Sequence, residues 1–340
     1  MKGASAGQPG QVVLVDYPEP EAQEQDVILS SSACGVCATD VKMVQKGAKD
    51  THFALGHELV GKVIKASSSQ AWKVGQRVAV APYLPCEQCY YCQHGQPALC
   101  THLYDISILP GGMVERVLVP AELARRGMFA LPDELSDELA TLAEPLGCLV
   151  KGLKDAHLQA GDSLAVIGDG PMGQLAAAAG KALGCSVVVM AGMTEHRLKA
   201  AQGLFADRTV DISKENLKDA VGECTEKRGA DVVLVTVSSG ETLLDGIGLV
   251  RPGGWVNAFA GVPEGTFIEL DVRKLHYQQF HLTGSSGLAP DNMEEALELL
   301  QSPTVDFSRV ISAHFLFPQV AEAVAYMEKR VGLKAIVTFS

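Results

Sequence analysis

The sequence predicts an α/β protein in which a β-rich segment precedes a doubly wound parallel sheet. Valine-rich runs without helical periodicity fill residues 11–130, separated by Gly, Pro and Ser, which is typical of short strands. From Gly161 onward, buried-strand runs such as "DSLAVIG" and "ADVVLVTVS" alternate with helix-like segments. That alternation indicates βαβ units and therefore a parallel sheet.

The elements follow in chain order. We expect strands in the β-rich segment within "QVVLVDY", "DVILSSSA", "ELVGKVIKAS", "QRVAVAPY" and "VERVLVP", and then a helical stretch, "LPDELSDELATLAEPLGCLVKGLKDA", with acidic residues in its early turns. The parallel sheet draws on "DSLAVIG", "CSVVVMAG", "TVDI", "ADVVLVTVS", "GWVNAFAG" and "FHLTGSS". Its helices lie in "PMGQLAAAAGKALG", "TEHRLKAAQGLF", "NLKDAVGECTEKRG" and "ETLLDGIGLVRPG". A helix in "NMEEALELLQS", the run "VISAHFLF" and a further helix and strand come last.

Composition limits the partners and the compartment. The 340 residues suffice for two domains, and 47% hydrophobic with 20% charged residues is ordinary for a folded protein. A net charge of −12 argues against a nucleic-acid or anionic-membrane surface, since both require a basic face. Neither a secretory leader pattern nor an apolar run long enough for a membrane span is present. We expect a cytoplasmic protein that binds neither nucleic acid nor membrane.

A tight cysteine cluster follows the spacing C-x2-C-x2-C-x7-C: Cys86, Cys89, Cys92 and Cys100. Because disulfides are rare in a reducing compartment, such a cluster predicts a metal site, and a chance grouping of buried thiols is the alternative. Four thiolates suit tetrahedral zinc with every position closed, so this site can hold a loop but cannot catalyse. Cys34 and Cys37 also form a C-x-x-C pair, which a redox dithiol would share, but no thioredoxin-like context follows.

A glycine turn follows the first strand expected in the parallel sheet. In "LAVIGDGPMGQL", Gly168, Gly170 and Gly173 form G-x-G-x-x-G directly after an apolar strand and open a helix. The first glycine permits the tight turn, the second lets the backbone approach a pyrophosphate, and the third lets helix and strand pack closely. The helix N-terminus faces the phosphates. This context predicts a dinucleotide site rather than a turn without a ligand.

The second strand of the parallel sheet lacks the acid expected at its end. Gly192 stands there, in "VVVMAGMTEHR", where an Asp or Glu would bind the adenosine ribose hydroxyls and repel a 2′-phosphate. Thr194, His196 and Arg197 offer hydroxyl and cationic donors to such a phosphate, while Glu195 could supply the missing acid. We expect NADP to be accepted at least as well as NAD.

A second set of metal donors lies in "ACGVCATD" and "LGHELVG". Cys37, His57 and Glu58 supply sulfur, nitrogen and oxygen, and Glu144 in "LAEPLGC" is a later carboxylate. Three protein ligands plus an open position define a catalytic zinc. Taken singly, His57 is more typical of a hydrogen-bonded structural histidine, and Glu144 of a helix surface. Residue type alone leaves both interpretations open.

In combination these motifs are highly specific, and the chain resembles the zinc-containing medium-chain dehydrogenase/reductases, within them the sorbitol (L-iditol) 2-dehydrogenase-like branch. The resemblance covers essentially the whole chain. It implies a GroES-like catalytic domain, 1–150 and 287–340, and a Rossmann NAD(P)-binding domain, 151–286, with the active site in the cleft between them. The shared features are Gly35 to Asp40, Gly56-His57-Glu58, the four-cysteine lobe at 85–101, Glu144-Pro145-Leu146, the glycine turn and "HYQQFHLTGSS".

The resemblance also implies site roles. Cys37 and His57 are implied as catalytic zinc ligands, with Glu58 and Glu144 completing the sphere directly or through water. Thr39 is implied as the hydroxyl that takes the substrate's proton, and the four-cysteine lobe holds a structural zinc, giving two zinc ions per chain. The implied cofactor contacts are Gly168, Gly170, Pro171, Met172, Gly173, Gly192, Thr194, His196, Arg197, Val237, Gly261 and Ser285.

The implied reaction is oxidation of a secondary alcohol of a polyol or sugar-like substrate to the ketone, by hydride transfer to NAD or NADP. A threonine 3-dehydrogenase-like or simple alcohol dehydrogenase is the alternative, because substrate-lining loops carry no motif. Outside enzymes, the alternative is a cofactor-binding regulatory or structural protein, against which the intact zinc-ligand set argues. The resemblance further implies a homodimer or homotetramer that pairs sheet edges near residues 280–286.

Overall fold

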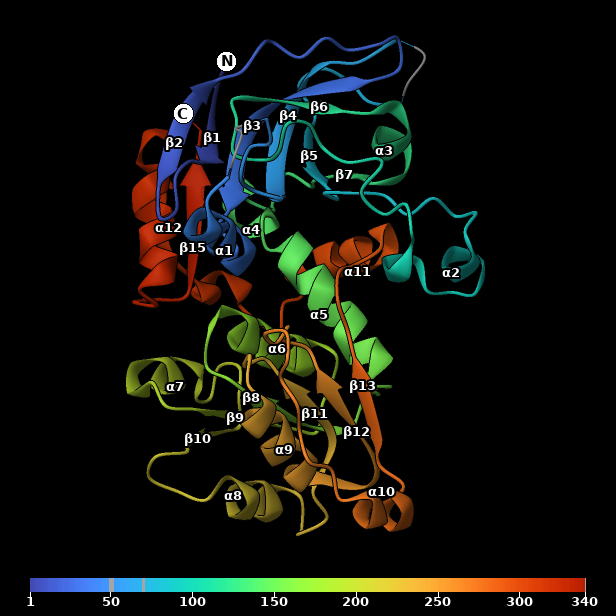
Figure 1. The fold of residues 1–340 in the computed structure, drawn as a ribbon, viewed down its shortest axis with the longest axis vertical. Coiled ribbons are helices and arrows are strands. Elements are labelled where there is room, and N and C mark those ends of the chain that lie inside the picture. The colour runs from blue at the N-terminus through green and yellow to red at the C-terminus, as the bar shows by residue number, and fades with distance from the viewer. Residues whose placement is uncertain (49–51, 69–70, 340) are drawn as a thin grey trace. The chain divides into compact units, whose positions relative to one another are not determined.

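The computed structural model describes residues 1–48, 52–68 and 71–339, which divide into two compact units (Figure 1). The first unit comprises residues 1–147, 288–301 and 311–340, and the second comprises 148–287 and 302–310. The sequence-based division placed 302–310 with the first domain. These residues belong to the second unit because the short 3-10 helix η2, Phe307–Val310, buries its apolar side chains and contacts helix α6, Pro171–Ala182.

A seven-stranded sheet frames the first unit. Its strand order is β14-β15-β3-β4-β5-β7, and β6 also pairs with β3. The strands are β3 Val27–Gly35, β4 Glu58–Lys65, β5 Arg77–Val80, β6 Arg116–Val119, β7 Met128–Ala130, β14 Ile311–Leu316 and β15 Lys334–Thr338. A separate two-stranded sheet joins β1, Lys2–Ala6, to β2, Val12–Asp16.

The helices of the first unit are short. They are α1 Ala38–Lys46, α2 Tyr90–Gln93, α3 Ala121–Arg126, α4 Asp137–Ala140, α11 Pro290–Leu300 and α12 Val320–Glu328, with 3-10 helices η1 Pro97–Leu99 and η3 Phe317–Gln319. A buried apolar cluster joins α1 and α12 to β1, β3 and β15 through residues such as Val41, Val324 and Ala335. The long stretch expected to be helical from residue 131 divides into α4, which Ser136 caps, and α5, Ala143–Asp155.

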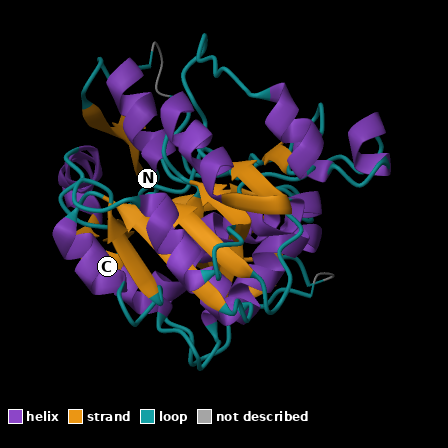
Figure 2. Cartoon of the chain, turned by 90° about the horizontal axis from the view of Figure 1, so that it is seen from below, coloured by secondary structure: helices purple, strands orange, loops and turns teal. Residues whose placement is uncertain are grey.

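The second unit contains a six-stranded sheet in which every neighbouring pair is parallel. Its order is β10-β9-β8-β11-β12-β13, with bounds β8 Ser163–Ile167, β9 Val187–Gly192, β10 Arg208–Asp211, β11 Ala230–Val235, β12 Val250–Ala258 and β13 His281–Gly284. Besides α6 and η2, the helices are α7 Glu195–Ala201, α8 Leu217–Cys224, α9 Gly240–Leu249 and α10 Val272–Gln278. Figure 2 shows the strands in orange and the helices in purple.

The core of this parallel sheet explains its sequence pattern. Strand β8 is buried along its whole length, because helices such as α6 and α9 pack against the sheet. A strand covered on both faces is apolar throughout, which is why "SLAVI" and "VVLV" do not alternate. The α/β class and the doubly wound parallel sheet are confirmed. Among the described residues, no helix is both long and apolar enough to cross a membrane.

Candidate metal and dinucleotide sites

Strand register brings the mixed metal donors together. Gly35 at the end of β3 pairs with Glu58 at the start of β4. Cys37 follows two residues later as the N-cap of α1, and His57 immediately precedes β4. The ligand atoms of Cys37, His57 and Glu58 consequently lie within 4.8 Å of one another. Three side chains that the sequence singled out thus form one compact group.

Asp40 holds the two segments of this group in place. Its buried carboxylate accepts hydrogen bonds from the backbone N–H of Cys37 at 2.9 Å and of Gly56 at 2.8 Å. The same carboxylate lies 3.8 Å from Nδ1 of His57. Sequence reasoning gave Asp40 no role of its own. The available signal was an acid at the third position of a helix, where it can bond back to the N-cap backbone.

A buried ion pair completes the group. The Nζ of Lys334, in β15, donates to Oε1 of Glu58, and both side chains are almost wholly buried, at 3% and 0% exposed. The other carboxylate oxygen, Glu58 Oε2, is buried with no hydrogen-bond partner among the described residues. Sequence reasoning missed Lys334, for which the only signal was a lysine within the apolar run "LKAIVTF".

Gly35 makes room for this carboxylate. A Cβ at Gly35 would lie 1.9 Å from Oε2 of Glu58, far closer than atoms of a folded protein approach. No positive φ is involved, so the requirement for glycine is one of space. The unpartnered oxygen therefore occupies a place that any other residue at position 35 would close.

The charges around the group favour a cation. Burial alone would lower the pKa of His57, but its hydrogen bond with Cys37 and the negative charges of Asp40 and Glu144 raise that pKa well above its ordinary value. Burial likewise opposes the charge of Lys334, and the Glu58 carboxylate, assisted by Cys37, nevertheless raises the pKa of this lysine. In both groups the surrounding negative charge stabilises the protonated form. A metal ion bound here would compete with these protons for the same negative charge.

Glu144 and Thr39 flank the compact group. Glu144 lies in the first turn of α5, is buried, and is close enough for its charge to raise the pKa values of His57 and Lys334. Thr39 is exposed in the first turn of α1, two residues after Cys37. A sulfur, nitrogen and oxygen donor set with an unpartnered buried carboxylate oxygen fits a catalytic zinc.

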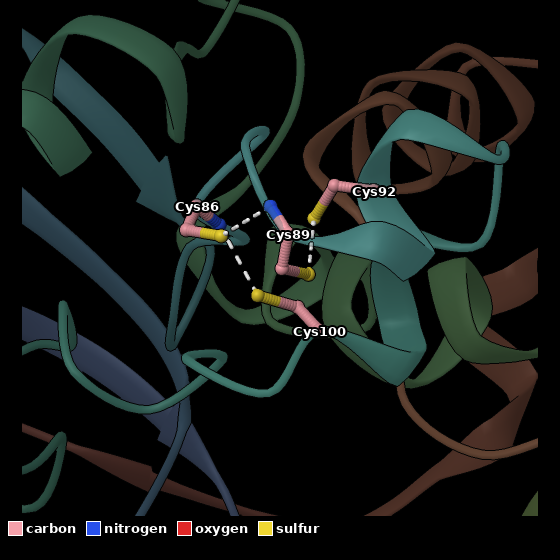
Figure 3. A group of neighbouring side chains, drawn as sticks. All are labelled: Cys86, Cys89, Cys92 and Cys100. Atoms are coloured by element: carbon pink, nitrogen blue, oxygen red, sulfur yellow. Dashed lines mark hydrogen bonds between the residues drawn. The ribbon is translucent and has the colours of Figure 1, made fainter.

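The four cysteines of the lobe also converge (Figure 3). Their sulfur atoms lie within 4.8 Å of one another, although the residues come from the loop before α2, its N-cap, α2 itself and the residue after η1. Backbone N–H groups point at the sulfurs, as from Cys89 to Cys86 and from His102 to Cys100, both at 3.3 Å. Backbone hydrogen bonds from Cys92 and Thr101 lower the pKa of Cys89 to about 5. This closed set of four thiols fits a structural zinc.

The glycine turn has the geometry that a dinucleotide requires. Gly168 has a φ of 123° between β8 and α6, and a Cβ there would lie 2.3 Å from Oγ1 of Thr236. A Cβ on Gly173 would lie 1.9 Å from the Gly168 carbonyl oxygen, so helix and strand are in direct backbone contact. At Gly170 a Cβ would meet no atom of the described residues within 4 Å beyond its two chain neighbours, which leaves this face open. Pro171 and Met172 occupy the first turn of α6.

The remaining predicted cofactor contacts lie on loops after neighbouring strands. Val237, 38% exposed, follows β11, and the Ser238 hydroxyl bonds to the carbonyl of Gly261 after β12. The Ser285 hydroxyl donates to Asp155 at 2.5 Å and accepts from Asn257 at 2.8 Å. The Ser285 side chain therefore ties α5 to β12.

An acid does lie at the end of β9, where the sequence has Gly192, but it comes from another part of the chain. The carboxylate of Asp169, from the glycine turn, lies directly against Gly192 and accepts from the backbone N–H of Thr194 at 2.7 Å. Arg197 is buried beside it, whereas His196 is exposed. Sequence reasoning missed Asp169, although it stands within the glycine motif itself.

Comparisons with known proteins agree with this arrangement. Residues 23–133 match the alcohol dehydrogenase GroES-like domain, and residues 171–302 match the zinc-binding dehydrogenase domain. The chain is 28% identical to a sorbitol dehydrogenase of Bacillus subtilis (strain 168), over 98% of this chain and 94% of that protein. It is 30% identical to an L-threonine 3-dehydrogenase of Shewanella putrefaciens (strain CN-32 / ATCC BAA-453), over 89% of each chain.

A solved structure extends the comparison to the fold. A protein described as a zinc-binding dehydrogenase from Sinorhizobium meliloti 1021, bound to NADP, superimposes with a TM-score of 0.89 at 25% identity. The match covers 99% of this chain and 98% of the other. From the two matched domains, the relatives along nearly the whole chain and this fold, the chain belongs to the zinc-containing medium-chain dehydrogenase/reductase family and is an oxidoreductase of the alcohol dehydrogenase type.

Proposed function

We propose that this enzyme is a zinc-dependent, NAD(P)-linked dehydrogenase that oxidises a secondary alcohol of a polyol or sugar-like substrate to the ketone. The group of Cys37, His57 and Glu58, with Glu144 close by, carries the proposal. The glutamate at position 144 resembles the polyol branch of the family and favours that branch. The sorbitol dehydrogenase among the relatives supports the same substrate class.

Each residue of the candidate site has its own role in the proposed reaction. Bound zinc would supply Lewis acidity toward the substrate oxygen, and bound nicotinamide would accept the hydride. Thr39, exposed beside Cys37, accepts the proton of the substrate hydroxyl and passes it to solvent. Asp40 fixes the backbone of Cys37 and Gly56, which holds the donor atoms in position. Lys334 balances the Glu58 charge inside the fold.

A substrate panel tests the proposal. Purified protein loaded with zinc is assayed with polyols, sugar alcohols, polyol phosphates, L-threonine and simple secondary alcohols, each with NAD and with NADP. We expect the highest kcat/KM on a polyol or its phosphate, and no turnover in Cys37→Ser. A threonine relative at 30% identity makes L-threonine the second candidate. Highest turnover on L-threonine would replace the polyol proposal, and cofactor binding without turnover of any alcohol would favour the regulatory alternative.

We also propose that the protein assembles with copies of itself and works in the cytoplasm. Strand β13 is one of the two edge strands of the parallel sheet and leaves Leu282 41% exposed, so a second copy could pair along it. We propose a homodimer or homotetramer, and a monomer mass in sedimentation at micromolar concentration would exclude both. All nine cysteines are free thiols, which suits zinc sites built in the reducing cytoplasm.

A further inference from the structure

The end of strand β9 holds a carboxylate from elsewhere in the chain. A Cβ at Gly192 would lie 2.3 Å from Oδ2 of Asp169 and 2.5 Å from its Cγ. An acid at position 192 would have to start in the space that the Asp169 side chain already fills. Asp169 is 9% exposed, so its position is set by packing as well as by hydrogen bonds.

The donors around this carboxylate are those that an anion at the end of β9 would use. Oδ2 of Asp169 accepts from the backbone N–H of Met193 at 3.0 Å and from that of Thr194 at 2.7 Å. Oδ1 lies 3.6 Å from Nη1 of Arg197, whose side chain is buried. Two backbone donors and one guanidinium are therefore engaged by an acid of the protein.

The neighbouring acid, Glu195, does not compete for this place. It is exposed and pairs with Lys199 at 2.7 Å, one turn further along α7. His196 is also exposed. Asp169 is consequently the acid closest to the place where the family's ribose-binding carboxylate would stand.

We propose that Asp169 replaces the missing acid at the end of β9 and makes the enzyme prefer NAD over NADP. The inference rests on the proposed dinucleotide-linked function and names the cofactor of that site. A 2′-phosphate would meet the like charge of Asp169 and would find the Met193 and Thr194 donors already occupied. A ribose 2′-hydroxyl, which is neutral and can donate, meets neither obstacle. The sequence-based expectation that NADP is accepted at least as well is replaced by this proposal.

Binding measurements test the inference independently of turnover. The dissociation constants of NAD+ and NADP+, and of the fragments 5′-AMP and 2′,5′-ADP, are measured by calorimetry on the full-length protein. We expect NAD+ to bind at least tenfold more tightly than NADP+, which corresponds to about 1.4 kcal/mol. Asp169→Ala and Asp169→Asn should each narrow that ratio at least tenfold, mainly by improving NADP+ and 2′,5′-ADP. The matched control Glu195→Gln, at the exposed acid nearby, should leave the ratio unchanged.

Moving the acid from position 169 to position 192 distinguishes the effect of its charge from a structural effect of Asp169. Gly192→Asp alone has no room for its Cβ beside Asp169, whose own Cβ would lie 2.5 Å away, whereas Asp169→Gly/Gly192→Asp vacates that space. We expect the double variant to recover the preference for NAD+. Equal binding of the two dinucleotides by the wild-type protein, or an unchanged ratio in Asp169→Ala and Asp169→Asn, would overturn the inference while leaving the proposed function intact. Binding of neither dinucleotide would instead overturn the proposed function.

Discussion

Removing Lys334 tests whether the buried pair beside the metal donors is ionised. In Lys334→Met the Glu58 carboxylate keeps its buried position but loses its bonded cation, and its second oxygen already has no hydrogen-bond partner among the described residues. Breaking a buried pair in this way costs about 3–5 kcal/mol, because an uncompensated charge remains inside. The matched control is Lys2→Met, whose pair with Asp16 is 54% and 76% exposed and is expected to contribute little.

Tryptophan fluorescence assigns the loss to the correct unit. Trp72 lies in the first unit and donates to the Ala124 carbonyl at 2.8 Å, while Trp255 lies in the second unit, stacked between two histidines. Urea unfolding in a Trp255→Phe background therefore reports on the unit that contains Lys334. We expect chelator-treated Lys334→Met to have a clearly lower free energy of unfolding than the unsubstituted Lys334 protein. If Glu58 binds zinc, added zinc should make this loss smaller.

A second substitution checks the electrostatic origin of the effect. Glu58→Gln/Lys334→Met removes both charges and should recover most of the lost free energy of unfolding. A loss of unfolding free energy in Lys334→Met no larger than in the Lys2→Met control would show that the pair is not ionised. A double variant no more stable than Lys334→Met alone would show that the loss comes from packing.

The remaining predictions concern metal and proton. Gly35→Ala should lower zinc affinity and turnover while the zinc of the cysteine lobe stays bound. The control Gly248→Ala, whose Cβ meets no other described residue within 4 Å outside its own helix, should change neither. A normal zinc content and a normal rate in Gly35→Ala would contradict this. Thr39→Val should slow turnover roughly 10²–10⁴-fold with zinc and dinucleotide still bound, and a near-normal rate at neutral pH would remove Thr39 from the mechanism. A chelator should extract one zinc together with activity before the second leaves, which timed metal analysis and assay can follow. Because the pKa of His57 is raised, protons compete with zinc for this side chain at a higher pH than they do at an ordinary histidine. Dialysis at falling pH should therefore release zinc from the mixed site, and retention of that zinc down to about pH 5 would contradict this prediction.

Much of the fold could be predicted because its signals are local. The alternation of strands and helices after Gly161 predicted the parallel sheet, and the glycine turn falls between β8 and α6 as expected. Strand β7, three residues long, and the break between α4 and α5 were not predicted. Elements this short depend on neighbours distant in sequence rather than on their own pattern.

The candidate site could be predicted only as far as its motifs extend. Cys37, His57 and Glu58 lie within motifs, and strand pairing brings them together. Lys334 lies 276 residues from its partner, and nothing local indicates that a lysine in an apolar strand pairs with a glutamate so far away. Asp169 could not be predicted for a related reason. Its carboxylate fills the space beside Gly192, which lies in β9, more than twenty residues further along the chain.

The discontinuity of the first unit has a consequence for the order in which a growing chain can fold. Strand β15 pairs with β3 through residues on the order of 300 positions apart, Cys34 and Val337, so the central sheet cannot close until the intervening unit has been synthesised. Closing so long a flexible loop costs roughly 5 kcal/mol of chain entropy. The second unit, residues 148–287 and 302–310, is complete in sequence before β15, so it can fold first and replace much of that loop with a rigid body. The donor group of Cys37, His57 and Glu58 therefore receives its buried lysine late in synthesis, and a metal ion that binds before then would meet Glu58 without its counter-ion.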